Sequence, residues 1–188
     1  MSCSWNLNDA NQKYNLSKNK VENNKIFLTD QYSSFTYGDL NSLSSKLSSQ
    51  LLSSFNSTDL NGEKIAILCS NNYTYLVSLL AIWKANGVPL GLNKTYPINL
   101  IEYFLNDSKC KLAINGISPD EAKNSNEALD SLLSNQNVCN FKLVEDEFFQ
   151  NKQSIINDQN NALESLMRLL DLPENSSKEG LILYTSGK

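Results

Sequence analysis

Apolar positions along this chain predict an alternation of buried strands and amphipathic helices. Residues 64–69 form a continuous apolar run of strand length, which indicates a strand covered on both faces, as in a parallel sheet. A helix is predicted next, and Asn86 and Gly87 mark its end, with Gly87 expected to supply the left-handed backbone there. The apolar stripe of that helix consists of Leu76, Leu79, Leu80 and Trp83.

The alternation continues beyond this helix. Residues 88–92 are predicted to form a short strand, and Pro89 places it near a sheet edge or at a strand start. Pro97 stands where the next helix begins, and residues 111–114 form a further strand that is ended by Asn115 and its neighbouring glycine. The buried face of the helix between them is expected to consist of Leu100, Ile101, Phe104 and Leu105.

The order of these elements predicts the fold class. Residues 64–115 give the succession β-α-β-α-β, which is typical of an α/β fold with a mostly parallel sheet and helices on its faces. Further along, helices are predicted at residues 127–133 and 162–172, and a strand at residues 141–144. Residues 181–184 are predicted to form a last, short and buried strand.

A hairpin and a capped helix are predicted before this unit. Residues 26–29 and 32–36 form the two strands of the hairpin. Thr36 and Asp39 have the spacing of a capping box, so a helix is expected to start there and to run to about Ser53. Its apolar stripe consists of Leu40, Leu43, Leu47 and Leu51.

The amino-terminal residues differ in composition from the rest. Residues 1–24 are polar and rich in asparagine, which predicts a flexible lead-in, and residues 25–188 are predicted to form one domain. The lead-in has no apolar core of a secretory signal, and its basic residues are lysines rather than the arginines typical of a mitochondrial presequence. The cytoplasm is therefore the expected compartment.

Composition narrows the chemistry that is open to this chain. The net charge of −4 and the pI near 4.9 argue against a nucleic-acid or anionic-membrane partner. No apolar run approaches the roughly 20 residues of a membrane span. The absence of histidine excludes a Ser/His/Asp triad and histidine-ligated zinc, and the 4 cysteines lack metal-ligand spacing. No catalytic or metal-ligating residue is assigned.

One stretch has the residues of a phosphate loop. The last predicted strand is followed by Thr185, Ser186, Gly187 and Lys188, which can offer hydroxyls, backbone N–H groups and a cation to a phosphate. Taken alone, such a string is common in loops, and Ile182 stands where a Walker loop would need its first glycine. Elsewhere, Asp39 is interpreted as a helix cap and Lys84 as a solvated helix end.

Three stretches taken in order resemble a known superfamily. Residues 35–40, residues 83–97 and residues 183–187 are similar to the first three core motifs of the adenylate-forming (AMP-binding) enzymes. This superfamily includes acyl-CoA synthetases, luciferases and the adenylation domains of peptide synthetases. Residues 81–111 most resemble the malonyl-CoA synthetase branch of the acyl-CoA synthetases.

The resemblance implies a fold, a reaction and a site. The chain would be the N-terminal part of the large domain of an acyl-CoA synthetase. Such an enzyme joins a carboxylic acid, here a short acid such as malonate, to ATP as an acyl-adenylate and then transfers the acyl group to coenzyme A. ATP, Mg²⁺ and CoA are the implied cofactors, and the branch also makes the mitochondrion the alternative compartment. Carried over by position, Thr185, Ser186 and Gly187 would bind the ATP phosphates.

The resemblance stops at Lys188, where the family has threonine or serine. The rest of the phosphate loop, the adenine contacts and the catalytic lysine of the family have no counterpart in these residues. The chain alone is therefore expected to be inactive. The alternative expectation is a non-catalytic fragment or interaction module that retains part of the fold.

Overall fold

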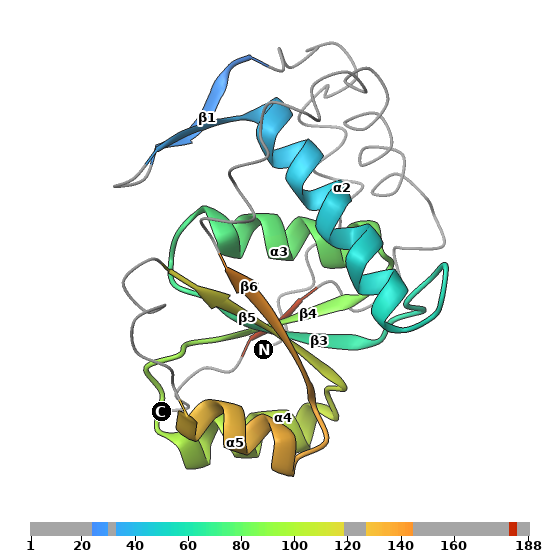
Figure 1. Ribbon diagram of the computed structural model, residues 1–188, viewed down its shortest axis with the longest axis vertical. Helices are drawn as coiled ribbons and strands as arrows, with labels where there is room; N and C mark the ends of the chain where they lie inside the picture. Colours follow the sequence, from blue (N-terminus) through green and yellow to red (C-terminus); the bar gives the residue numbers. More distant parts are fainter. Residues whose placement is uncertain (1–23, 30–32, 119–126, 145–180, 184–188) are drawn as a thin grey trace, which may run out of the picture.

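The computed structural model describes residues 24–29, 33–118, 127–144 and 181–183. Within them, the helices are α2 (Tyr37–Ser54), α3 (Tyr73–Lys84), α4 (Ile98–Ser108) and α5 (Glu127–Asn135) (Figure 1). The strands are β1 (Ile26–Thr29), β2 (Ser34–Thr36), β3 (Lys64–Leu68), β4 (Val88–Leu92), β5 (Leu112–Ile117), β6 (Cys139–Val144) and β7 (Ile182–Leu183). The predicted helix at residues 162–172 lies outside the described residues.

The described part of the chain is built on one parallel sheet. Its strand order is β6-β5-β3-β4-β7, and every neighbouring pair is parallel. β4 lies on one side of β3, whereas β5, the next strand along the chain, lies on the other side. Pro89 comes just before Leu90, where the pairing of β4 with β7 begins, as expected for a proline near a strand start. The predicted α/β class with a parallel sheet is confirmed.

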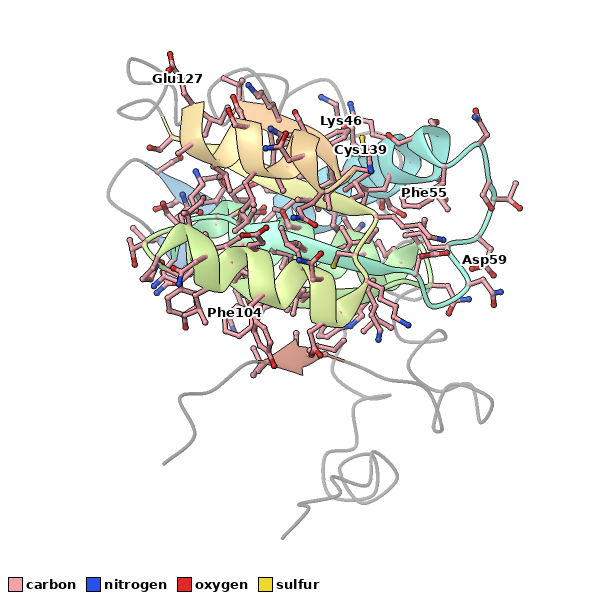
Figure 2. The ribbon with its side chains drawn as sticks, turned by 90° about the horizontal axis from the view of Figure 1, so that it is seen from below. Lys46, Phe55, Asp59, Phe104, Glu127 and Cys139 are labelled. Carbon is pink, nitrogen blue, oxygen red and sulfur yellow. The ribbon has the colours of Figure 1, made fainter. Side chains whose placement is uncertain are left out.

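Helices cover both faces of this sheet (Figure 1). α2 and α3 lie over one face, and α4 and α5 lie over the other. In β3, Ile65 and Ile67 belong to the core beneath α2 and α3, whereas Ala66 and Leu68 belong to the core beneath α4 and α5. Two-sided burial is the reason that β3 is continuously apolar. Figure 2 shows Phe104 projecting from α4 on the side where β7 lies.

The predicted hairpin and capped helix are both present. β1 and β2 are antiparallel, and the predicted turn between them falls on residues 30–32, outside the described residues. The Thr36 hydroxyl accepts a hydrogen bond from the Asp39 N–H at 3.1 Å, and the Asp39 carboxylate accepts one from the Thr36 N–H at 2.9 Å. This capping box starts α2, which buries the predicted stripe of Leu40, Leu43, Leu47 and Leu51.

The buried face of α3 differs from the prediction. The expected stripe of Leu76, Leu79, Leu80 and Trp83 is only partly buried. α3 packs on the sheet and also contacts α2, so it is apolar around most of its circumference and leucine positions do not mark its deepest face. Several residues on that face are small, which suits close packing. The most buried residues are Tyr73, Thr74, Val77, Ser78, Ala81 and Ile82.

The end of α3 also differs from the prediction. Asn86, with φ of 59°, has the left-handed backbone that was expected of Gly87. Gly87 is needed for space instead, because a Cβ there would lie 2.9 Å from Leu60 Cδ1 and 3.2 Å from the Glu63 carbonyl oxygen. The helix end is predicted correctly, but Asn86 and not Gly87 supplies the left-handed backbone.

Two strands have limits other than those predicted. β5 does not end at Asn115 but continues to Ile117, because β6 pairs with it over this length. β7 was expected to be buried, yet Leu183 is 61% exposed. Among the described residues, β7 pairs with β4 alone, so it is an edge strand of the described sheet.

Candidate functional site

The carboxyl ends of the strands gather at one edge of the sheet because all the strands are parallel. The chain leaves β3 toward α3 on one face, and it leaves β4 toward α4 on the other face. Open α/β sheets bind ligands outside such a reversal, where the two exits diverge. The fold therefore makes this carboxyl edge the candidate site.

The predicted phosphate loop follows the strand at this edge. β7 pairs with β4 through Ile182 opposite Leu90 and Leu183 opposite Gly91, so the carboxyl end of β7 lies beside that of β4. Thr185, Ser186 and Gly187 themselves lie outside the described residues. Their assignment to phosphate binding stays a prediction.

Tyr75 of α3 contacts the sheet where β4 pairs with β7. A Cβ at Gly91 would lie 2.9 Å from the Tyr75 Oη and 3.5 Å from Leu183 Cδ2. Glycine at this position in β4 therefore makes room for the tyrosine hydroxyl, close to the last described residue of β7. Sequence reasoning interpreted Gly91 only as part of a strand, because the approach of Tyr75 depends on how α3 packs.

A lysine that sequence reasoning missed lies at the same edge. The Lys94 ammonium donates a hydrogen bond to the Gly116 carbonyl, which ties the end of β4 to β5 across β3. Asn93 shapes the turn before it, since its Oδ1 accepts hydrogen bonds from the Thr95 N–H and Thr95 hydroxyl, both at 2.9 Å. A cation at a carboxyl edge suits an anionic ligand. Its place two residues after a predicted parallel strand was the signal that could have found it.

The residues that follow β3 at this edge have structural roles. The Asn72 Oδ1 accepts a hydrogen bond from the Thr74 N–H at 3.1 Å and caps α3. Cys69 is buried, and a Cβ at Gly116 would lie 2.7 Å from its Sγ. Cys69 therefore behaves as a packed core residue, in agreement with its apolar surroundings in the sequence.

The sequence indicated that Lys84 is a solvated helix end, and this interpretation is wrong. The Lys84 Nζ donates hydrogen bonds to the Asn41 carbonyl oxygen at 2.9 Å, the Asn41 Oδ1 at 2.7 Å and the Ser45 Oγ at 2.8 Å. Burial lowers the pKa of the Lys84 amine to about 8. The packing of α3 against α2 encloses the side chain, and this contact could not be inferred from the sequence around Lys84.

The described residues are also informative about metals and membranes. Within them, no group of three or more cysteine, aspartate or glutamate side chains could hold a metal ion. None of the helices in this part of the chain is long and apolar enough to cross a membrane.

The parallel sheet with helices on both faces defines an open α/β domain, a class whose ligands bind at the carboxyl edge of the sheet. The sequence model of one family, described as "AMP-binding enzyme", matches residues 17–187. The chain therefore belongs to the AMP-binding enzyme family, as its three motifs had suggested.

About half of the chain is similar in sequence to a malonate–CoA ligase. "Malonate--CoA ligase ACSF3, mitochondrial" from Bos taurus is 33% identical over 94 residues, which are 49% of this chain and 16% of that protein. The matched part of the chain thus spans about a sixth of the length of this relative.

Solved structures show the same fold. Apo MatB from Rhodopseudomonas palustris matches with a TM-score of 0.58 and 17% identity over 97% of this chain and 33% of that chain. The anthranilate CoA ligase AuaEII, in complex with anthranoyl-AMP, matches with a TM-score of 0.56 and 18% identity over 85% of this chain and 28% of that chain. The parallel sheet and its helices correspond to the N-terminal domain of adenylate-forming CoA ligases.

Proposed function

We propose that this chain forms the N-terminal part of an ATP-dependent acyl-CoA synthetase. The observation that carries the proposal is the family match over residues 17–187, because it includes all three motif stretches in their expected order. Each motif is short, but the three occur together on a chain with the matching α/β fold.

In this proposal the phosphate loop follows β7. Thr185, Ser186 and Gly187 donate hydroxyl and backbone hydrogen bonds to the β- and γ-phosphates of ATP, with Mg²⁺ bound to the nucleotide. The parallel pairing of β7 with β4 supports this arrangement, since it brings the carboxyl end of β7 to the candidate edge. Lys94 supports it further by adding positive charge to that edge.

The proposed acid is a short dicarboxylic acid such as malonate. Two observations support this choice: residues 81–111 resemble the malonyl-CoA synthetase branch, and the bovine relative is named as a malonate–CoA ligase. We assign no described residue to recognition of the acid. CoA would be the acyl acceptor, as in the names of these relatives.

A pyrophosphate-release assay tests the function on the whole protein that carries these residues. We expect release to require ATP and CoA and to be fastest with malonate among malonate, methylmalonate, acetate and octanoate. Faster turnover with another of these acids would refute malonate as the substrate but would still support acyl-CoA synthetase activity. No turnover with any acid, despite a folded protein, would refute the synthetase itself.

Variants of the loop test the assigned residues. Thr185→Ala and Ser186→Ala are each expected to lower kcat/KM for ATP by about 10-fold or more, because each removes a donor to charged oxygens. Thr58→Ala is the matched control, since Thr58 is exposed in the loop between α2 and β3. Equal activity of the loop variants and the control would remove Thr185 and Ser186 from the site.

Two further properties belong to the proposal. We assign residues 1–24 to a lead-in and residues 25–188 to the domain, and limited proteolysis with mass spectrometry tests that boundary. For the compartment we keep the cytoplasm, with the mitochondrion as the alternative because the bovine relative is named mitochondrial. Microscopy of the whole protein with a carboxyl-terminal fluorescent tag distinguishes the two.

A further inference from the structure

The side chain of Tyr75 extends from the first turn of α3 over the sheet. A Cβ at Gly91 would lie 2.9 Å from the Tyr75 Oη and 3.7 Å from its Cε2, so the hydroxyl end of the ring covers β4 at that glycine. Tyr73, two residues earlier, is instead fully buried in the core, where its ring stacks on Phe35. Of these two tyrosines, Tyr75 is therefore the one whose hydroxyl approaches the candidate site.

The Tyr75 hydroxyl lies beside β7 as well as β4. The same Cβ position at Gly91 is 3.5 Å from Leu183 Cδ2, and Gly91 pairs with Leu183 across the two strands. The Leu183 side chain thus lies on the face of the sheet that α3 covers. Ile182 packs against the core beneath α4 and α5, on the opposite face. The side chains of β7 therefore alternate between the two faces, as in a regular strand.

This alternation relates Tyr75 to the predicted phosphate loop. Residues two apart in a strand share a face and are about 7 Å apart. The sequence predicts that the strand continues to residue 184, so we expect Thr185 on the face of Leu183 and Tyr75. A separation of about 7 Å is within reach of an aromatic side chain. The Tyr75 hydroxyl and the first predicted phosphate donor are hence expected to be neighbours.

The Tyr75 hydroxyl can donate to such a neighbour. It has no hydrogen-bond partner among the described residues, although the tyrosine is half-buried. Tyrosine hydroxyls in such positions usually find a partner. A threonine hydroxyl that accepts a hydrogen bond keeps its own proton to donate, and hydrogen bonds in a chain strengthen one another.

We propose that Tyr75 is a positioning residue of the phosphate loop. Its hydroxyl donates a hydrogen bond to the Thr185 Oγ1, which turns the Thr185 proton toward a phosphate oxygen of ATP. The inference rests on the proposed function, because it explains how the Thr185 hydroxyl is oriented there. Gly91 belongs to the same arrangement, since it leaves the space that the tyrosine hydroxyl occupies.

Removal of the hydroxyl tests the proposal in the whole protein that carries these residues. We expect Tyr75→Phe to weaken the binding of Mg·ATP in calorimetric titration, and to raise the KM for ATP, by about 3- to 10-fold. The KM for CoA should stay unchanged. Tyr103→Phe is the matched control, because it removes the same hydroxyl from a side chain of α4 that is 59% exposed. Equal ATP affinity of the two variants would overturn the proposal.

A double-mutant cycle tests whether Tyr75 acts through Thr185. If the tyrosine orients the threonine hydroxyl, its loss has no effect once that hydroxyl is absent. We therefore expect Tyr75→Phe with Thr185→Ala to bind ATP within about twofold of Thr185→Ala alone. A double variant whose loss of affinity equals the product of the two single losses would contradict the assigned contact.

A substitution at Gly91 displaces the hydroxyl without removing it. The added Cβ of Gly91→Ala meets the far end of the tyrosine side chain, so the ring can move while the fold remains. We expect ATP affinity to fall as in Tyr75→Phe, and the two substitutions together to cause no further loss. Circular dichroism verifies that each variant folds. Wild-type ATP affinity in Gly91→Ala would contradict the proposed place of the hydroxyl.

The failure of this inference is distinguishable from the failure of the proposed function. Wild-type turnover of an acid, together with equal ATP affinity of Tyr75→Phe and Tyr103→Phe, would refute the role of Tyr75 and leave the synthetase in place. Absence of turnover with every acid would refute the synthetase, while the titrations with Mg·ATP still measure the effect of Tyr75. Absence of ATP binding by the wild-type protein would overturn both.

Discussion

Residues with a left-handed backbone show how single side chains shape this fold. Those other than glycine are, in the described part of the chain, Asn56, Asn61, Asn86, Lys109 and Asn137. Asparagine tolerates this conformation because its short side chain forms local hydrogen bonds, so it can replace glycine in turns. Lys109 has no such advantage. With φ of 58° and ψ of 37°, it ends α4 under steric strain.

Replacement of Lys109 by glycine should therefore stabilise the protein. We expect Lys109→Gly to raise the free energy of unfolding by about 0.5–1 kcal/mol, because relief of the Cβ strain exceeds the added freedom of the unfolded chain. Urea denaturation measures the change. Lys46→Gly, in the middle of α2, is the matched control and should destabilise by about 1 kcal/mol. Destabilisation by both substitutions would contradict the strain at Lys109.

At the scale of elements, the contact between α2 and α3 depends on local and distant groups. The capping box of Thr36 and Asp39 sets where α2 begins. Asn41, one turn further, then accepts hydrogen bonds from Lys84, which is 43 residues away along the chain. The start of one helix thus determines whether the end of the other finds its partners.

Loss of the cap should weaken α2. Thr36→Ala removes the acceptor of the Asp39 N–H, and we expect a loss of about 1 kcal/mol in the free energy of unfolding. Thermal denaturation by circular dichroism measures it. Thr58→Ala, at an exposed loop position, should change stability by less than about 0.5 kcal/mol. Equal effects of the two substitutions would argue against the capping box.

The Lys84 amine should make stability depend on pH. Its pKa is lowered in the folded protein, so between about pH 8 and pH 10 the unfolded chain binds more protons and stability rises with pH. The rise is at most about 1.4 kcal/mol per pH unit. We expect urea denaturation to show that the Lys84→Met variant lacks this rise in the free energy of unfolding between pH 8 and pH 10.

A buried tyrosine limits the pH range of that measurement. Burial and, to a smaller degree, the Asp39 charge raise the pKa of the Tyr73 hydroxyl. Above about pH 10 the unfolded chain loses the tyrosine proton first, so stability falls with pH there. A wild-type curve parallel to that of Lys84→Met between pH 8 and pH 10 would contradict the lowered pKa of Lys84.

At the scale of the whole molecule, β3 joins the two cores. It pairs with β4 and β5 on its two edges, and its side chains alternate between the two helix-covered faces. β7 has the opposite position at the sheet edge, with Leu183 largely exposed. Within the parallel sheet, apolar burial is therefore complete in the central strand β3 and low in β7, near the candidate site.

Truncation of one side chain in each strand should show this difference. Ile67→Ala, in fully buried β3, is expected to lower the free energy of unfolding by about 2–5 kcal/mol, because it leaves a cavity. Leu183→Ala, in exposed β7, should change it by less than about 0.5 kcal/mol. Urea denaturation, analysed with the same dependence of the unfolding free energy on urea concentration for both variants, compares the two losses of stability. A large effect at Leu183 would show that more of the chain covers β7.

Local patterns predicted the elements well where one face of an element is buried. α2 shows its leucine stripe and its cap because solvent covers the opposite face and leaves it polar. The same reasoning failed for α3, which is apolar on most sides because it contacts both the sheet and α2. It also failed at Gly87, whose role depends on the approach of Leu60 and not on its own backbone.

The amino-acid sequence by itself determined the strands, the helices, the capping box and the family motifs, because these depend on residues close together along the chain. Only the tertiary structure decided the strand order, the gathering of Lys94 and β7 at one edge, and the uncharged surroundings of Lys84. Each of those depends on residues far apart in the sequence. The Lys94 contact exists only once the parallel sheet has placed β4 and β5 on opposite sides of β3, and the Lys84 contact only once α3 has packed against α2.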